Sequence, residues 1–406
     1  MIKKIEKFLQ TDLTYLAQGG SWITANNIVS SFASFVLLIA FGYFLPKNSY
    51  GTYQYVLSIA GILTIPTLSG IDTSMVRAVA TGHSGSMLTG FKSKIRWGML
   101  GGLASLVLAF YYFLNNNITL GLSFVIVAAF VPFMDSFTLY GAYLSGKKMF
   151  KNSSVYSSII NIFRVISLLL GLILTNNVIL IVLIYFASNT LLNSIFFMLV
   201  FKKYIPKNEP EDSATISYGK HLSLMGILGN IASQVDKMFL FQNIGSAELA
   251  IYTFATSPIT RITTLMSPIT TLAYPKFSET DPATLKRTLP RKIFHLFVIS
   301  SLITGVYILL APWIYKIVFP KYLDSVIYSQ IFALSILFFP QKLLAVALTA
   351  YQQKRALYMI NTVSPIIKIA FLLILLPIYG IWGAIITLLI SRFINGTMSV
   401  YYFNKI

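Results

Sequence analysis

Long apolar segments run through this 406-residue sequence and restrict its possible folds more than any other feature. A helix needs about 20 mostly apolar residues to cross the hydrocarbon layer of a bilayer. Twelve segments fit, at about residues 22–44, 51–74, 97–114, 118–143, 153–175, 178–201, 218–241, 250–274, 293–315, 326–349, 357–378 and 381–402. Hydrophobic residues make up 56% of the chain and charged residues 11%, which is too apolar for a soluble domain of this length. We therefore predict an all-α integral membrane protein with twelve transmembrane helices.

Basic residues are distributed unevenly among the loops. Most of the 31 Lys and Arg fall in alternate loops and near both ends of the chain, whereas the remaining loops hold only Lys47, Lys316 and Lys321. Cytoplasmic loops carry the excess of Lys and Arg in membrane proteins, so both termini are predicted to be cytoplasmic. Because these charges are dispersed over short loops, they argue against nucleic acid as a partner and for contact with anionic membrane lipids.

The sequence also contains an internal repeat. A shift of 204 residues superposes Lys151 on Arg355 and Arg164 on Lys368. Such repeats are frequent in membrane transporters. We expect one six-helix bundle over residues 1–203, which includes an amphipathic surface helix near residues 1–18, and a second over 218–406. The proline-interrupted segment 204–217 is predicted to be a cytoplasmic linker about which the halves rock, and a monomer suffices because one chain holds both halves.

Several basic residues remain inside the predicted spans. They are Arg164, Lys237, Arg261, Lys342, Lys368 and Arg392. A cation at the bilayer centre costs about 2.5–3.5 kcal/mol and normally marks a pathway or a binding site. The helical rise places Arg164 about 18 Å below Asn152 and Lys368 about 19 Å below Arg355, whereas Lys237 and Lys342 can reach the headgroups. These positions predict a membrane carrier for an anionic substrate.

Polar residues repeat at helical spacing on four of the spans. The sets are Thr24, Asn27, Ser31 and Ser34; Ser154, Ser157, Asn161 and Arg164; Ser223, Gly226, Asn230 and Ser233; and Tyr358, Asn361, Pro365 and Lys368. Such faces either pack against other helices or line a cavity. A cation ends the stripe on the fifth and eleventh spans, and there we favour a cavity.

Acids are scarce in the spans, where Asp72, Asp135 and Asp236 lie inside or at an edge. Asp135 and Asp236 could bind H⁺ or Na⁺ and bias two conformations, or they could neutralise a buried cation. For Asp135 we favour an ion pair, with Arg164 as one candidate partner, and for Asp236 both readings stay open. The chain has no Cys, its three His are scattered, and it lacks a phosphate-binding loop motif, so we expect no metal, no cofactor and no ATP hydrolysis.

Several short motifs resemble those of the bacterial polysaccharide (O-antigen type) flippases. These proteins belong to the superfamily of multidrug, oligosaccharidyl-lipid and polysaccharide exporters. The motifs lie at residues 44–53, 68–77, 234–237, 248–252 and 377–384 and read FLPKNSYGTY, LSGIDTSMVR, QVDK, ELAIY and PIYGIWGA. Each is weak alone, but their order and their spacing relative to the predicted helices are specific.

The resemblance implies two six-helix bundles around a central cavity that opens alternately to either side of the bacterial inner membrane. It also implies a substrate, an oligosaccharide repeat unit on undecaprenyl pyrophosphate, that moves from the inner to the outer leaflet. In this reading the pyrophosphate would meet Arg164, Arg261, Lys368 and Arg392. The amides of Asn27, Asn161, Asn230 and Asn361 would bind the glycan.

Other functions fit the resemblance less well. Multidrug exporters of the superfamily usually take cations, for which we expect a carboxylate-rich site, and lipid II flippases typically have two further helices and arginines on the first two spans. An enzyme acting on lipid-linked sugars would need a larger extramembrane loop or a catalytic carboxylate pair. A channel would conduct ions without any dependence on a sugar-lipid. We predict a transporter and not an enzyme.

Overall fold

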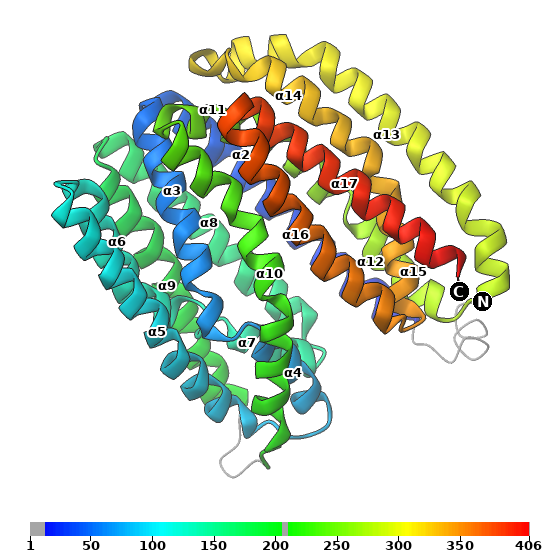
Figure 1. Ribbon diagram of the computed structural model, residues 1–406. Coiled ribbons are helices and arrows are strands. Elements are labelled where there is room, and N and C mark those ends of the chain that lie inside the picture. Colours follow the sequence, from blue (N-terminus) through cyan, green and yellow to red (C-terminus); the bar gives the residue numbers. More distant parts are fainter. Residues whose placement is uncertain (1–12, 205–209, 406) are drawn as a thin grey trace. The chain divides into compact units, whose positions relative to one another are not determined.

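The fold is built from helices throughout the part of the chain that the structure describes. The computed structural model describes residues 13–204 and 210–405 (Figure 1). The first nine helical elements are α2 (Leu13–Phe44), α3 (Lys47–Leu63), η1 (Ile65–Thr67), α4 (Gly70–Ala80), α5 (Ser86–Leu114), α6 (Ile118–Met134), α7 (Leu139–Gly146), α8 (Phe150–Leu174) and α9 (Val178–Tyr204). The others are α10 (Ala214–Asn243), α11 (Ser246–Leu265), α12 (Pro268–Ser278), α13 (Pro282–Val318), η2 (Pro320–Tyr322), α14 (Ser325–Ala333), η3 (Leu334–Gln341), α15 (Lys342–Ala350), α16 (Lys354–Tyr379) and α17 (Ile381–Asn404).

Each predicted span falls on a helix or on a helix interrupted by a short break. Among the described residues, nine helical segments are long and apolar enough to cross a membrane, or ten if the pair 47–67 and 70–80, bent by 46°, forms one span. The more polar α10 and α11, at 30 and 20 residues, are long enough but are not among them. The chain is therefore a multi-pass membrane protein, and twelve crossings and cytoplasmic termini remain predictions. Most of the predicted surface helix at residues 1–18 lies outside the described part.

One predicted boundary is wrong in a way that matters for the site. The sequence places Lys94 in a basic loop before a span that begins near residue 97, but α5 already begins at Ser86. Lys94 therefore lies within this 29-residue helix, and its side chain is fully buried. The run of basic residues suggested a loop, and Lys92 and Arg96 are indeed exposed. Lys94 lies on another face of the helix and is buried.

The described helices form two compact units. Unit 1 comprises residues 1–34, 63–170 and 183–225, and unit 2 comprises residues 35–62, 171–182 and 226–406. In unit 1, α5 lies alongside α6 and α4 packs on α7; in unit 2, α16 lies alongside α17 and α12 packs on α15 (Figure 1). The divisions fall within α2, α3, α8, α9 and α10, so these helices contribute residues to both units, α3 only its last residue to unit 1.

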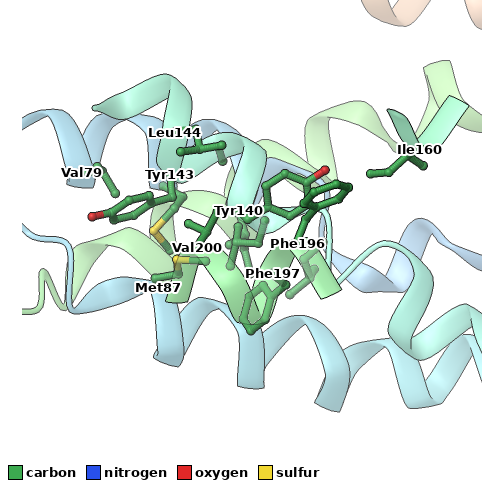
Figure 2. Close-up of a cluster of buried hydrophobic side chains, with 14 residues drawn as sticks. Val79, Met87, Tyr140, Tyr143, Leu144, Ile160, Phe196, Phe197 and Val200 are labelled. Atoms are coloured by element: carbon green, nitrogen blue, oxygen red, sulfur yellow. The ribbon is translucent and has the colours of Figure 1, made fainter. Parts of the chain in front are cut away.

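A hydrophobic core holds the helices of unit 1 together at one end. Figure 2 shows its buried side chains, which come from five helices and include Val79, Met87, Tyr143, Ile160 and Phe196. The ring of Phe196 stacks on Tyr156 with centroids 4.4 Å apart, a separation typical of favourable aromatic pairs. This core fixes α4 and α5, which carry Asp72 and Lys94 of a charge cluster.

Two glycines in the motifs of the sequence allow close helix contacts. A Cβ added at Gly51 would lie 1.7 Å from the Ser246 carbonyl oxygen in unit 2, and one at Gly70 would lie 2.4 Å from the Gly219 carbonyl oxygen in unit 1. The Gly70 amide also donates to Ser223 Oγ at 2.9 Å. These motif positions therefore require glycine for packing.

The same turn occurs at equivalent places in the repeat. Lys148 follows α7 with φ +60°, and Gln352, 204 residues later, follows α15 with φ +53°. The flanking backbone hydrogen bonds also correspond, since the amide of Lys148 donates to Ser145 O and that of Gln352 donates to Thr349 O. The structure thus supports the 204-residue repeat with a conformation that ordinary side chains rarely adopt.

Replacement of Gln352 tests this left-handed turn. Gln352 is exposed and adopts positive φ, so Gln352→Gly should raise the free energy of unfolding by up to about 1 kcal/mol. Gln352→Val should lower it, because a β-branched residue tolerates positive φ poorly. Denaturation of the detergent-solubilised protein measures both, and equal stability of the two variants would contradict the assignment.

Asp212 caps the start of α10. Its carboxylate accepts hydrogen bonds from the Ala214 amide at 2.9 Å and from Thr215 Oγ1 at 3.1 Å. The backbone hydrogen bond from Ala214 is the largest cause that lowers the pKa of Asp212 below its ordinary value of 3.8, and the Thr215 hydroxyl adds to it. A carboxylate with a depressed pKa stabilises the folded state above its unfolded pKa, and that contribution is lost as the pH falls through the folded value.

The cap predicts a local dependence on pH. Above pH 3.8 the charged Asp212 carboxylate should stabilise the first turn of α10. This stabilisation should be lost at lower pH, as the carboxylate becomes protonated. Asp212→Asn should retain a cap without this titration, because Asn also accepts from the helix amides. Amide exchange at Ala214 and Thr215 in the two proteins, compared above and below pH 3.8, measures the difference. Identical pH profiles would rule out a charge-dependent cap.

Candidate functional site

Breaks in two helical spans of unit 1 bring acidic side chains to the middle of α5. The chain between α3 and α4 passes through η1, where Leu68 has φ +61°, and Asp72 lies in the first turn of α4. The break between α6 and α7 follows Pro132, and Asp135 is the residue at which α6 ends. A carboxylate in the first turn of a helix is favoured by the helix dipole, which suits Asp72.

Lys94 lies between these two carboxylates. Its Nζ is 2.7 Å from Asp72 Oδ1 and 3.2 Å from Asp135 Oδ2, and Thr67 Oγ1 donates to Asp135 Oδ2 at 2.6 Å. The lysine side chain is 0% exposed, whereas the side chains of Asp72 and Asp135 are 34% and 28% exposed. With all three ionised, the group carries a formal charge of −1, and its accessible side is formed by carboxylates.

The structure therefore gives Asp135 a different partner from the predicted Arg164. Sequence reasoning missed Lys94, although a signal was present in the residues around it. The buried face of α5 carries Gly90, Lys94, Gly98, Gly101 and Ser105, a helical repeat in which Lys94 stands among small residues. A basic residue in register with such a stripe indicates an inward-facing side chain.

Arg164 belongs to a hydrogen-bonded polar group on α8 and α2 of unit 1. Its Nη2 donates to Asn161 Oδ1 at 2.7 Å, and the Asn161 amide donates to Ser30 Oγ at 2.7 Å. The guanidinium lies 5.8 Å from the centre of the Tyr185 ring. Arg164 forms no ion pair with any carboxylate in residues 13–204 and 210–405. An arginine held by neutral groups keeps donors for an anion.

Polar residues next to the predicted stripe of α2 contact α8. Asn26 accepts from Ser158 Oγ at 2.9 Å, and Ser30, one turn further on, accepts from the Asn161 amide. In the predicted stripe itself, Asn27 is half-buried and Ser31 is buried. The polar residues beside the stripe therefore serve helix packing.

Lys368, the repeat equivalent of Arg164, has a carboxylate partner in unit 2. Its Nζ lies 3.8 Å from Asp236 Oδ1 and donates to the Ala232 carbonyl oxygen. The Tyr252 hydroxyl donates to Asp236 Oδ2. The side chains of Lys368 and Asp236 are 11% and 8% exposed, so the pair is largely shielded from solvent.

The other predicted site residues lie elsewhere in unit 2. Arg392 on α17 donates to the Ser335 carbonyl oxygen at 3.3 Å and lies 5.0 Å from the centre of the Phe332 ring. Arg261 on α11 is half-buried, whereas Asn230 on α10 and Asn361 on α16 are exposed. Arg164 is thus the one predicted cation in unit 1, and Arg261, Lys368 and Arg392 are in unit 2.

Comparison with known proteins assigns the chain to a family. The profile of the family "Polysaccharide biosynthesis protein" matches residues 16–281, well over half of the sequence. The chain belongs to this family. Its superfamily is that of the multidrug, oligosaccharidyl-lipid and polysaccharide exporters, as the sequence motifs predicted. No curated protein matches the sequence significantly.

Solved structures share the fold of this polysaccharide biosynthesis family member. An outward-facing multidrug resistance transporter of the MATE family has a TM-score of 0.61 and 12% identity, over 95% of this chain and 94% of that one. The eukaryotic MATE transporter AtDTX14 has a TM-score of 0.63 and 11% identity, over 96% and 94%. A Pyrococcus furiosus transporter of the superfamily, described as having a binding pocket of reversed polarity, has a TM-score of 0.58 and 12% identity, over 95% of each chain. Family and fold are those of membrane transporters and not of enzymes.

Removal of the Lys94 charge should destabilise this transporter strongly. Lys94→Met leaves Asp72 and Asp135 close together without a cation, and loss of one partner of a buried ion pair costs about 3–5 kcal/mol. Lys92→Met removes the same charge from an exposed position on the same helix and should change the stability by less than about 0.5 kcal/mol. Denaturation of both variants in detergent measures the contrast. Equal stabilities would show that the ion pairs contribute nothing.

Proposed function

We propose that the chain is a flippase that moves oligosaccharide repeat units linked to undecaprenyl pyrophosphate from the inner to the outer leaflet of the bacterial cytoplasmic membrane. Membership of the polysaccharide biosynthesis family supports a carbohydrate-related cargo. The observation that carries the proposal is Arg164, a half-buried cation inside an apolar helix whose described partners are neutral. A cation inside a membrane span costs free energy, and such residues normally mark a binding site or a transport pathway. We therefore assign Arg164 to the binding of an anion.

The chemistry around Arg164 suits a phosphorylated glycan. A guanidinium has five donors in a fixed plane and binds phosphate oxygens through charge-assisted hydrogen bonds. Two hydrogen-bonded pairs on α8 and α2, Asn161 with Ser30 and Ser158 with Asn26, add amides and hydroxyls of the kind that bind sugar hydroxyls. In this proposal Arg261, Lys368 and Arg392 add positive charge for the pyrophosphate, and Asn27, Asn230 and Asn361 contact the glycan.

Alternating access would carry the bound head group across the membrane while the polyprenyl chain stays in lipid. Asp135 and Asp236 are then candidates for H⁺ or Na⁺ coupling, since protonation or ion binding would weaken their pairs with Lys94 and Lys368. A lipid II type substrate carries the same pyrophosphate and is included in this proposal as a second glycan.

A second candidate function is cation export of the multidrug type. The specific observation in its favour is the group of Lys94, Asp72 and Asp135, whose accessible atoms belong to two carboxylates. The Lys94 ammonium already neutralises part of that charge at 2.7 Å and 3.2 Å, so we rank this function below the flippase.

Reconstitution in sealed vesicles tests the proposal. Wild-type protein should expose labelled undecaprenyl-pyrophosphate oligosaccharide in the opposite leaflet without changing it chemically. Arg164→Gln should slow this step by at least about tenfold, because a charge-assisted hydrogen bond to a phosphate is lost. Arg164→Lys should be intermediate, and Lys92→Gln should match the wild type.

The same vesicles separate the alternatives. Imposed H⁺ or Na⁺ gradients that change the rate would support coupling, and elongation of the glycan would mean an enzyme. Accumulation of a cationic dye without movement of the sugar-lipid would favour the multidrug function. A folded Arg164→Gln variant with the wild-type rate would refute the role of Arg164.

A further inference from the structure

A cavity of about 590 Å³ lies within unit 2, among α13, the η3–α15 segment and α17. Figure 1 shows the beginning of α13 near α15 and near the end of α17. Its walls are mainly apolar, and a single charged side chain, Lys286, lines it. The cavity shares none of the residues to which the transport site is assigned above.

The residues on α13 give the cavity a charged end and an apolar body. Lys286, Pro290, Ile293, Phe294 and Phe297 follow one another at helical spacing along a single face. From Lys286 to Phe297 the helix rises about 16 Å, close to half of the roughly 30 Å hydrocarbon layer. The span predicted from the sequence begins near residue 293, so Lys286 lies on the head-group side of the cavity and Ile293, Phe294 and Phe297 lie on its hydrocarbon side.

Opposite walls complete the apolar body. Leu337 comes from η3, Leu344 from α15, and Val400 and Phe403 from α17. Leu344 and Phe403 also belong to the hydrophobic cluster with Phe277 and Leu289, which anchors the wall to the interior of unit 2. A hydrocarbon chain in this space would contact side chains on three sides.

Lys286 has a neutral partner. Its Nζ donates to the Asn404 backbone carbonyl oxygen at 3.1 Å, and it forms no ion pair with any carboxylate in the described part of the chain. The nearby Asp281 carboxylate accepts from the amides of Ala283 and Thr284 at 3.1 Å and 3.2 Å as the cap of α13. The ammonium therefore retains donors for an external anion.

The surrounding charge is strongly positive. The Tyr351 hydroxyl donates to the Thr280 carbonyl oxygen at 2.7 Å and ties the α15–α16 turn to the α12–α13 turn. The segments 276–292 and 351–355, which contain these turns, carry the acids Glu279 and Asp281 and, besides Lys286, the basic residues Lys276, Arg287, Arg291, Lys292, Lys354 and Arg355. Basic pockets between transmembrane helices attract the head groups of anionic lipids.

We propose that this cavity binds an anionic phospholipid, with the phosphate at Lys286 and one acyl chain along Ile293, Phe294 and Phe297. Soluble phosphate would not use the apolar walls, and an uncharged lipid would not use the cation. The combination of a cation at one end and apolar walls beside it selects a lipid that carries a negative charge next to its chains.

Lipid binding to the purified full-length transporter tests the assignment. Native mass spectrometry with added phosphatidylglycerol or phosphatidylcholine of the same acyl chains should show preferential retention of phosphatidylglycerol. Lys286→Gln should weaken phosphatidylglycerol binding about tenfold, because a charge-assisted contact is lost. Lys316→Gln removes an exposed lysine from the opposite end of α13 and should leave binding unchanged.

A second variant tests the apolar part independently of charge. Val400 lines the cavity and is 41% exposed, so Val400→Trp should fill the space for the acyl chain without unfolding the protein, and should also weaken binding. Equal retention of the two phospholipids, or wild-type binding by folded Lys286→Gln and Val400→Trp proteins, would overturn the assignment. Preferential retention of undecaprenyl phosphate over phosphatidylglycerol would overturn it as well, since the occupant would then be the transported type of lipid.

Discussion

An ammonium group enclosed in an apolar helix bundle must be neutralised where it lies, because neither water nor distant charge can stabilise it there. The fully buried Lys94 imposes this requirement on unit 1. The helix breaks before α4 and after α6 place the carboxylates of Asp72 and Asp135 beside the Lys94 ammonium. The irregular backbone at these breaks therefore stabilises the buried charge.

Sequence periodicity was sufficient for the class of fold and for the order of the helices, because the apolar length needed to cross a bilayer leaves few alternatives. It did not predict where a helix begins when basic residues lie near its end. The sequence alone does not distinguish Lys94 from its basic neighbours Lys92 and Arg96. In α5 the helical rotation buries Lys94 and leaves the other two side chains exposed. The contact of Asn26 with Ser158 was also beyond the pattern, because the packing of the neighbouring helix decides which of two adjacent amides on one helix finds a partner there.

The partners of buried cations depend on tertiary contacts that no spacing rule provides. Arg164 and Lys368 were recognised as equivalent from their depth and the repeat, but one is held by Asn161 and the other by Asp236. Equivalent positions have therefore acquired different electrostatic surroundings. A cation with a neutral neighbour remains available to an anion, whereas a paired cation must first be released, so the proposed function assigns the two positions different parts.

The turns at Lys148 and Gln352 have a broader consequence. Neither position carries the glycine that its backbone conformation favours, yet both retain the same dihedral region and the same pattern of amide contacts. The same local main-chain geometry therefore recurs 204 residues apart without the same side chain. Coordinates reveal an equivalence of this kind where a comparison of the residues alone would miss it.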